Sequence, residues 1–187
     1  MDAKDGLAGS VYDCYFDYRY WHVRYWIGDT GQWLPGRKIL LTPQAIEKID
    51  QLIERFWVSL TKTQIAESPG IETYLPVSRQ REEALHAHYG WAMYWGSYPS
   101  VAARIPSAPK IMPHDEAQEK IEGDPNLRSA REVTGYHIAV TDGDIGHVDD
   151  FILDVVEDAI RYLVIDTKNW LPGRKVLIAP SWVKKID

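Results

Sequence analysis

The sequence predicts a mainly β fold with some helix, of the α+β class, arranged as two small antiparallel β-barrels joined by a helical segment and a proline-rich linker. Three observations predict it. Residues 1–50 match residues 138–187 without a gap, and 21 of the 50 positions are identical. Both matching regions alternate short apolar stretches with turn residues, which is typical of small barrels. Between them, prolines and small residues replace that pattern, as in a semi-rigid linker.

The repeat is clearest in the stretch Trp-Leu-Pro-Gly-Arg-Lys, which occurs at 33–38 and again at 170–175. Its Pro-Gly pair suits the centre of a type II turn, because proline fixes φ and glycine accepts the positive value. A fixed spacing of 137 residues indicates an internal duplication. We therefore treat residue n of the first repeat and residue n + 137 of the second as equivalent positions.

The first repeat is predicted to contain strands at 11–18, 23–27 and 38–41 after a glycine-rich turn at 5–10. Cys14, Phe16 and Tyr18 match the apolar residues 151, 153 and 155, so this alternating face is predicted to point inward. Thr42 followed by a proline suits the start of a short helical turn. Residues 47–50 then close the repeat.

The middle of the chain is predicted to be partly helical. Residues 53–60 continue as a strand, and Thr61 with Gln64 has capping-box spacing for a short helix ending near 67. Ser78 is expected to cap a longer helix that runs to Tyr89 and stops at Gly90. The aromatic residues of 91–98 are interpreted as a flap packed on a barrel rather than a ligand cage.

Four regions follow from these observations: an N-terminally incomplete first repeat at 1–60, a helical and aromatic segment at 61–96, a proline-rich linker at 97–126 and a second repeat at 127–187. Before the matched part, the second repeat has a predicted strand at 131–140, for which the first repeat has no counterpart. A barrel that lacks its first strand has an open edge, and open edges pair with other chains. We therefore expect a homodimer through the first repeat.

The second repeat resembles the PRC-barrel family. The resemblance rests on Asp142-Gly143-x-Ile145-Gly146-x-Val148-x-Asp150, on the strand at 161–166, and on Leu171-Pro172-Gly173-Arg174 followed by the strand and Ala-Pro at 175–180. Residues 5–50 resemble a second member. The family includes the cytoplasmic domain of the photosynthetic reaction-centre H subunit and the C-terminal domain of a ribosome maturation factor. The resemblance implies a small barrel that binds proteins or RNA, with no general catalytic residues.

Composition narrows the possible functions. The formal net charge of −6 disfavours nucleic acid as a partner, because phosphate binding usually needs a basic patch. The single cysteine fits a reducing cytoplasm. No stretch is apolar and long enough for a membrane span or a signal peptide. We therefore expect a cytoplasmic protein.

The sequence offers no catalytic, cofactor or metal site that outweighs its ordinary structural interpretation, and we expect the protein not to be an enzyme. Asp142, Asp144 and Asp149 fail the spacing of a calcium loop, because Gly146 stands where a ligand should be. The six histidines show no metal-ligand spacing with a plausible third member. Cys14 is equivalent to Phe151 and is predicted to be a core residue.

Exposed tryptophan and arginine residues often dominate protein interfaces. The predicted interaction surface therefore consists of Trp33, Arg37, Trp170 and Arg174. The alternative is that these tryptophans close the barrel ends. Arg24 and Arg161, like Asp29 and Asp166, are kept in both repeats, either as ion pairs or turn bonds that stabilise each barrel or as partner contacts.

The expected function is a non-catalytic, cytoplasmic protein-interaction or assembly-scaffold protein with an unidentified protein partner. One alternative, from the maturation factor, is an RNA- or ribosome-associated factor. Another, from the H subunit, is a protein associated with photosynthetic electron transport. An enzyme with a site between the barrels would require a deep cleft and a perturbed titratable group.

Overall fold

The computed structural model describes residues 1–50, 52–69, 79–91, 124, 126–141, 143–167, 174–184 and 186. The strands are β1 (Asp2–Ala3), β2 (Gly6–Leu7), β3 (Ser10–Asp17), β4 (His22–Asp29), β5 (Lys38–Leu41), β6 (Ile46–Asp50), β7 (Arg55–Val58), β8 (Leu127–Ser129), β9 (His137–Val140), β10 (Gly143–Asp154), β11 (Ala159–Asp166) and β12 (Lys175–Ile178). The helices are α1 (Lys62–Glu67), α2 (Arg79–Tyr89) and α4 (Ala130–Val133), with short 3-10 turns η1 (Pro43–Ala45) and η3 (Pro180–Trp182). The predicted mainly β, α+β class is confirmed.

The two repeats pair their strands in the same register. All seven residue pairs between β3 and β4 recur 137 residues later between β10 and β11, including both bulges. The four pairs between β4 and β5 recur in the same way between β11 and β12. Even the short hairpin is shared, since Ala3 opposite Gly6 matches Val140 opposite Gly143. The offset found in the sequence therefore holds in the pairing of the strands.

Glycines at two equivalent positions allow these strands to pack. A Cβ atom on Gly9 would lie 1.9 Å from the carbonyl oxygen of Asp29, and one on Gly146 would lie 2.0 Å from that of Asp166. Both glycines also have φ values in the region that disfavours other residues, at 126° and 135°. Gly36, with φ of 75°, occupies the predicted Pro-Gly turn.

The first repeat retains part of the strand that the sequence predicted to be absent. The two residues of β1 pair with β2, in the register that β9 and β10 show, and also lie parallel to β7 at Trp57. The expectation that the first repeat has no counterpart of this strand is therefore wrong. The predicted strand at 131–140 is also partly wrong, because α4 occupies 130–133 and the strand starts only at His137. Ser129 caps α4 by accepting from the amide of Glu132.

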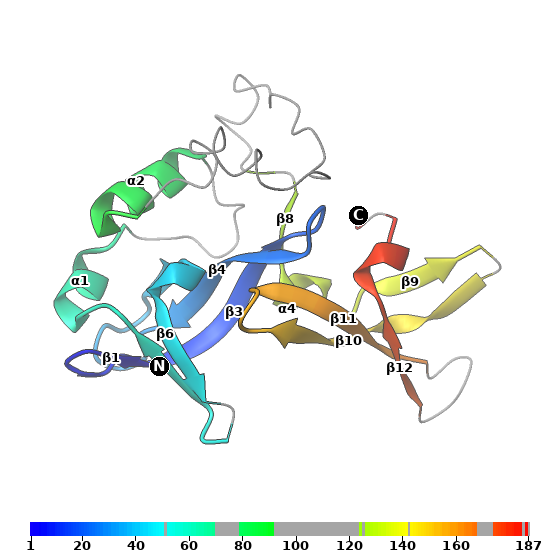
Figure 1. Ribbon diagram of the computed structural model, residues 1–187, viewed down its shortest axis with the longest axis horizontal. Helices are drawn as coiled ribbons and strands as arrows, with labels where there is room; N and C mark the ends of the chain where they lie inside the picture. The colour runs from blue at the N-terminus through cyan, green and yellow to red at the C-terminus, as the bar shows by residue number, and fades with distance from the viewer. Residues whose placement is uncertain are drawn as a thin grey trace.

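The repeats meet along the hairpins β3–β4 and β10–β11 (Figure 1). His22 pairs with its own equivalent, Ala159, in the antiparallel contact between β4 and β11. Two reciprocal hydrogen bonds flank this pair: the amide of Val23 donates to the carbonyl of Asp158, and the amide of Ile160 donates to the carbonyl of Trp21, both at 2.7 Å. Equivalent groups thus exchange equivalent bonds, so an approximate twofold axis relates the two repeats.

The described strands form two open sheets, in the orders β2-β1-β7-β6 and β8-β3-β4-β11-β10-β9, with β5 on β4 and β12 on β11. Their hydrogen bonding does not close either repeat into a ring, in contrast to the barrels that we expected. The capping box at Thr61 and Gln64 is present as predicted. Figure 1 shows α1 and α2 beside the first repeat. Among the described residues, every helix is too short or too polar to cross a membrane.

Each repeat has its own core. The two cores touch where the hairpins β3–β4 and β10–β11 meet, and we call this contact the seam. Cys14, Trp26 and Leu41 belong to the first cluster. Leu163 belongs to the second, together with Phe16 from β3 of the first repeat. The Phe16 ring lies 5.7 Å from that of Phe151, measured between ring centroids. The inward face predicted for Cys14 and Phe16 is therefore confirmed, and Phe16 crosses to the other core.

Candidate functional site

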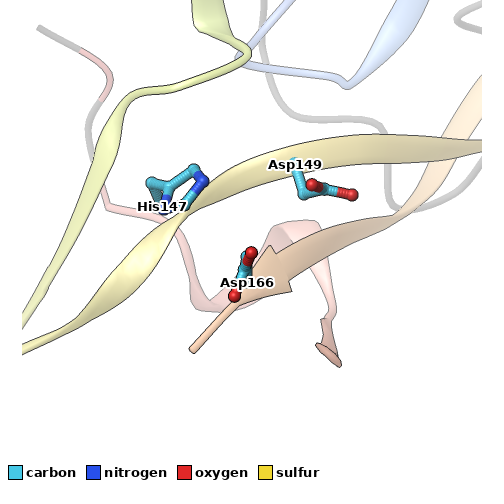
Figure 2. A group of neighbouring side chains, drawn as sticks. All are labelled: His147, Asp149 and Asp166. Atoms are coloured by element: carbon cyan, nitrogen blue, oxygen red, sulfur yellow. The ribbon is translucent and has the colours of Figure 1, made fainter. Parts of the chain in front are cut away.

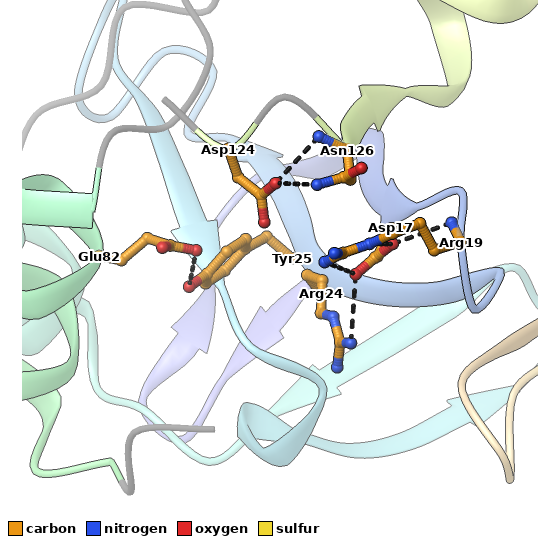
Figure 3. Close-up of polar contacts among 7 residues, drawn as sticks. All are labelled: Asp17, Arg19, Arg24, Tyr25, Glu82, Asp124 and Asn126. Atoms are coloured by element: carbon orange, nitrogen blue, oxygen red, sulfur yellow. Dashed lines mark hydrogen bonds and ion pairs between the residues drawn. The ribbon is translucent and has the colours of Figure 1, made fainter. Parts of the chain in front are cut away.

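The outer face of the first repeat consists of Tyr15, Tyr25, Ile27 and Leu40, and helix α2 covers it. Leu85 from α2 belongs to the same buried cluster as these four residues. The hydroxyl of Tyr25 donates to Glu82 Oε1 at 2.9 Å and lies 3.3 Å from His86 Nε2. Figure 3 shows the Glu82 carboxylate reaching from the helix to this hydroxyl. Helix α2 therefore covers this face through the apolar side chain of Leu85 and through polar contacts of Glu82 and His86 with Tyr25.

The equivalent face of the second repeat is apolar and exposed. It consists of Ile152, Tyr162, Val164 and Leu177, which adjoin one another because Ile152 pairs with Tyr162 and Val164 pairs with Leu177. The exposed fractions are 42% for Ile152, 43% for Tyr162 and 52% for Leu177, whereas Tyr25 is 0% exposed. Within the part of the chain that the structure describes, no helix packs on this face. Contiguous exposed apolar residues of this kind mark interaction sites.

The two repeats also differ at a strand edge. Strand β8 pairs with β3 at Tyr15, Phe16 and Asp17, and covers that edge. The equivalent stretch of β10, Ile152–Asp154, pairs with β11, and no other strand of the described ranges lies on its opposite side. In the described structure this edge is therefore open in the second repeat only, and it differs from the edge next to the first strand, which was predicted to be open in the first repeat. The reason for this difference is that β8, at the start of the second repeat, pairs with β3 of the first repeat.

A cavity of about 510 Å³ lies at the seam, next to this open edge. Strands of both repeats line it, through Trp26, Ile49 and Phe56 on one side and Phe151, Leu153 and Val155 on the other. Asp50 and Glu54 also contribute to its lining. The cavity is within the volume range of ligand sites and largely apolar, and it can therefore accept an apolar side chain.

The predicted surface residues of the first repeat are partly structural. Trp33 is half-buried, and its indole Nε1 donates to the carbonyl of Ala8 at 2.9 Å. The Lys62 ammonium lies 4.8 Å from the centre of its ring. Arg37 is half-buried, and its guanidinium donates to the carbonyl of Ser68 just after α1. Both side chains thus tie the loop at 33–37 to neighbouring segments.

In the second repeat, Arg174 is exposed, and Trp170 lies outside the described residues. The structure therefore describes three of the four predicted residues, Trp33, Arg37 and Arg174. That they contact a partner stays a prediction.

The two equivalent arginines form ion pairs within each repeat, as the structural interpretation predicted. Arg24 lies 3.6 Å from Asp17, which also pairs with Arg19 at 3.3 Å (Figure 3). At the equivalent positions Arg161 pairs with Asp154 at 2.9 Å. The Arg24 and Arg161 pairs each join the two strands of one hairpin, β3 to β4 and β10 to β11.

One cluster with metal-ligating side chains was missed by the sequence analysis. His147, Asp149 and Asp166 bring three ligand atoms within 4.8 Å of one another (Figure 2). His147 and Asp149 lie on β10, and Asp166 lies at the end of β11. The two strands are neighbours, and His147 pairs directly with Asp166. Their equivalents in the first repeat are Ser10, Tyr12 and Asp29, so the cluster belongs to the second repeat alone.

An ammonium group already neutralises part of this cluster. Lys175 Nζ lies 2.6 Å from Asp149 Oδ2. Asp149 and Asp166 raise the pKa of Lys175 above its usual value, through the hydrogen bond to Asp149 and the charge of both carboxylates. Ion pairing therefore accounts for the cluster, although a divalent cation would find one imidazole and two carboxylates there.

Cys14 is a core residue, as predicted. It is 5% exposed, and burial, aided by the nearby Asp13 carboxylate, raises its thiol pKa to about 12. A thiol that stays protonated is a poor nucleophile.

The outer face and the open edge depend on which distant segments pack on each repeat. The sequence does carry a signal for the face, because the second repeat keeps an alternating apolar pattern at 152, 162, 164 and 177. It gives no signal that α2 covers only one of the two equivalent faces.

No protein-family model matches the chain, and no curated protein matches it.

Proposed function

We propose that this protein is a non-catalytic interaction or assembly-scaffold protein of the PRC-barrel type, which binds an amphipathic helix of a partner protein on the outer face of its second repeat. One observation carries the proposal. The equivalent face of the first repeat holds helix α2, whereas the face at Ile152, Tyr162 and Leu177 is exposed within the described structure. The PRC-barrel part rests on the motif resemblance alone.

The contacts of α2 define the chemistry of the partner. In the first repeat Leu85 fills the apolar face, and Glu82 accepts from the Tyr25 hydroxyl. Tyr162 is equivalent to Tyr25 and offers the same hydroxyl. The partner helix therefore carries a leucine or similar residue three positions after a glutamate, which places both side chains on one helix face.

The experiment uses a labelled helical peptide of residues 78–91, which contains α2, as the probe. Its binding to the full-length chain is measured by fluorescence anisotropy. We expect a dissociation constant on the order of 100 µM, since a short helix buries little surface. Leu177→Asp should abolish binding, because it places a charge in the middle of the apolar face. Val156→Asp is the matched control, since Val156 is 84% exposed and lies outside the face.

Equal binding by the Leu177→Asp and Val156→Asp variants would overturn the proposed site. The solution mass, measured by light scattering at two concentrations, tests a different occupant. A dimer that Leu177→Asp dissociates would show that a second copy of the chain covers the face and would overturn the partner helix.

A further inference from the structure

The edge of β3 shows which kind of segment this fold accepts. The amide of Tyr18 donates to the carbonyl of Asn126 at 3.1 Å, which continues the antiparallel pairing of β3 with β8. Asp13 anchors the segment twice: Oδ2 accepts from the Ser129 hydroxyl at 2.5 Å, and Oδ1 accepts from the amide of Arg131 at 3.1 Å. A strand followed by a helical turn is thus fixed by one carboxylate.

Two apolar side chains of the same segment are buried. Leu127 joins the outer-face cluster of the first repeat. Val133, on α4, joins the cluster that contains Phe16, Leu163 and Ile186. The segment therefore has the pattern apolar-x-Ser-x-x-x-apolar, in which the first apolar residue and the serine precede the helical turn.

The second repeat has the matching receptor positions without such a segment in the described structure. Leu153, Trp26 and Ile49 line the seam cavity, and they are the twofold equivalents of the three residues named above that share a buried cluster with Val133. Asp150 is equivalent to Asp13, and its Oδ1 accepts from the amide of Phe151 as Asp13 accepts from that of Cys14. Asp150 is exposed, whereas Asp13 is half-buried.

We propose that the β10 edge and the seam cavity bind an extended segment of a partner protein with the pattern apolar-x-Ser-x-x-x-apolar. The segment adds to β10 as an antiparallel strand along Ile152–Asp154, its serine hydroxyl donates to Asp150, and its last apolar side chain enters the cavity. This site adjoins the outer face at Ile152, but its strand pairing, its contact with Asp150 and its use of the cavity do not depend on the helix proposed above.

Charge adds a preference to this pattern. Arg131 follows the serine of the bound segment by two positions, and its guanidinium lies 4.4 Å from the centre of the Tyr12 ring. The equivalent of Tyr12 is Asp149, and Asp50 and Glu54 line the cavity. A basic residue two positions after the serine therefore fits the second site better than an acidic one.

In this sequence only the segment 127–133 combines the pattern with a basic residue two positions after the serine. That segment is bound on β3, so we expect the ligand of β10 to come from another molecule. The protein itself nevertheless supplies the probe. A fluorescein-labelled peptide of residues 126–135 contains the whole pattern. We expect it to bind the full-length chain with a dissociation constant on the order of tens of micromolar, measured by anisotropy.

Two variants of the protein test the two halves of the site. Asp150→Asn retains the acceptor for the Phe151 amide but removes the charge, and should weaken binding by roughly tenfold. Ile49→Trp fills the cavity from a half-buried position and should weaken binding by a similar factor. Glu157→Gln, at an exposed turn position, is the control and should leave binding unchanged. A peptide with alanine in place of its serine should lose affinity for wild type but not for Asp150→Asn.

Equal affinity of wild type, Asp150→Asn and Ile49→Trp would overturn the site, and so would no anisotropy change. Binding that Leu177→Asp abolishes while both edge variants keep it would assign the peptide to the outer face and overturn the edge site. An increase in solution mass that Asp150→Asn prevents would show a second copy as the occupant and overturn the partner-protein segment.

Discussion

The hydroxyl of Tyr25 donates a hydrogen bond to the carboxylate of Glu82 at 2.9 Å, and both side chains are 0% exposed. This bond joins a strand of the first repeat to helix α2, 57 residues later. A buried carboxylate is costly without hydrogen bonds, so the contact fixes where the helix docks. In the described structure no helix covers the equivalent Tyr162. The two repeats therefore present the same face, which is covered by a helix in the first repeat and exposed in the second.

Tyr25→Phe should lower the free energy of unfolding by about 1–3 kcal/mol, because Glu82 loses one of its buried partners. Urea denaturation followed by circular dichroism measures the change. Tyr162→Phe is the control at the equivalent exposed position and should change stability by less than about 0.5 kcal/mol. Equal losses in the two variants would contradict the assigned role of the Tyr25 hydroxyl.

Gly146→Ala should lower the free energy of unfolding by about 3 kcal/mol or more, since the new Cβ meets the Asp166 carbonyl and φ is 135°. Gly31→Ala also changes a glycine of positive φ but has nothing within 4 Å, so its cost should be about 1 kcal/mol. Chemical denaturation of both variants distinguishes the cost of the close contact at residue 146 from the cost of positive φ, which both variants share. Similar costs would show that the close approach is relieved by a small shift of β11.

Removing the Arg37 side chain should destabilise the protein, and removing that of Arg174 should not. Arg37 donates to Ser68 from a half-buried position, whereas Arg174 is exposed. Arg37→Ala should cost about 1–2 kcal/mol and Arg174→Ala less than about 0.5 kcal/mol, measured by urea denaturation. Equal effects would indicate that these equivalent arginines have the same role.

Stability should fall above pH 9. The pKa of Cys14 is raised to about 12 by burial and by Asp13, and that of Tyr15 is raised to about 12 by burial and nearby acidic groups. For both groups the folded pKa exceeds the unfolded value, so their contribution is complete below the unfolded pKa and is lost as pH rises towards 12. Cys14→Ala should make the decline of unfolding free energy between pH 9 and 12 shallower. An unchanged slope would exclude the thiol as a cause.

Lys175→Gln should make the chain bind Zn²⁺ at least about tenfold more tightly than wild type. The substitution removes the ammonium that pairs with Asp149 and leaves one imidazole and two carboxylates together. Isothermal titration calorimetry measures the affinity. The double variant Lys175→Gln/His147→Ala is the control, and its affinity should return to that of wild type. Identical affinity of wild type and Lys175→Gln would contradict the role assigned to Lys175.

The sequence by itself determined the local elements. The strands at β3, β4 and β5, the Pro-Gly turn, the capping box at Thr61 and the end of α2 at Gly90 all follow from alternation, from positive φ and from hydrogen bonds within a few residues. It also fixed the 137-residue offset, because equivalent side chains make equivalent strand pairs. These features depend on neighbours that are close along the chain.

Only the tertiary structure decided which segment covers which repeat. The crossing of β8 to β3, the docking of α2 on one face, and the meeting of His147 with Asp166 join residues that are far apart in sequence. The twofold relation gives both repeats equivalent surfaces, and in the described part of the chain β8 and α2 cover those of the first repeat. Which repeat receives them depends on the packing of whole elements, and no local pattern carries that information.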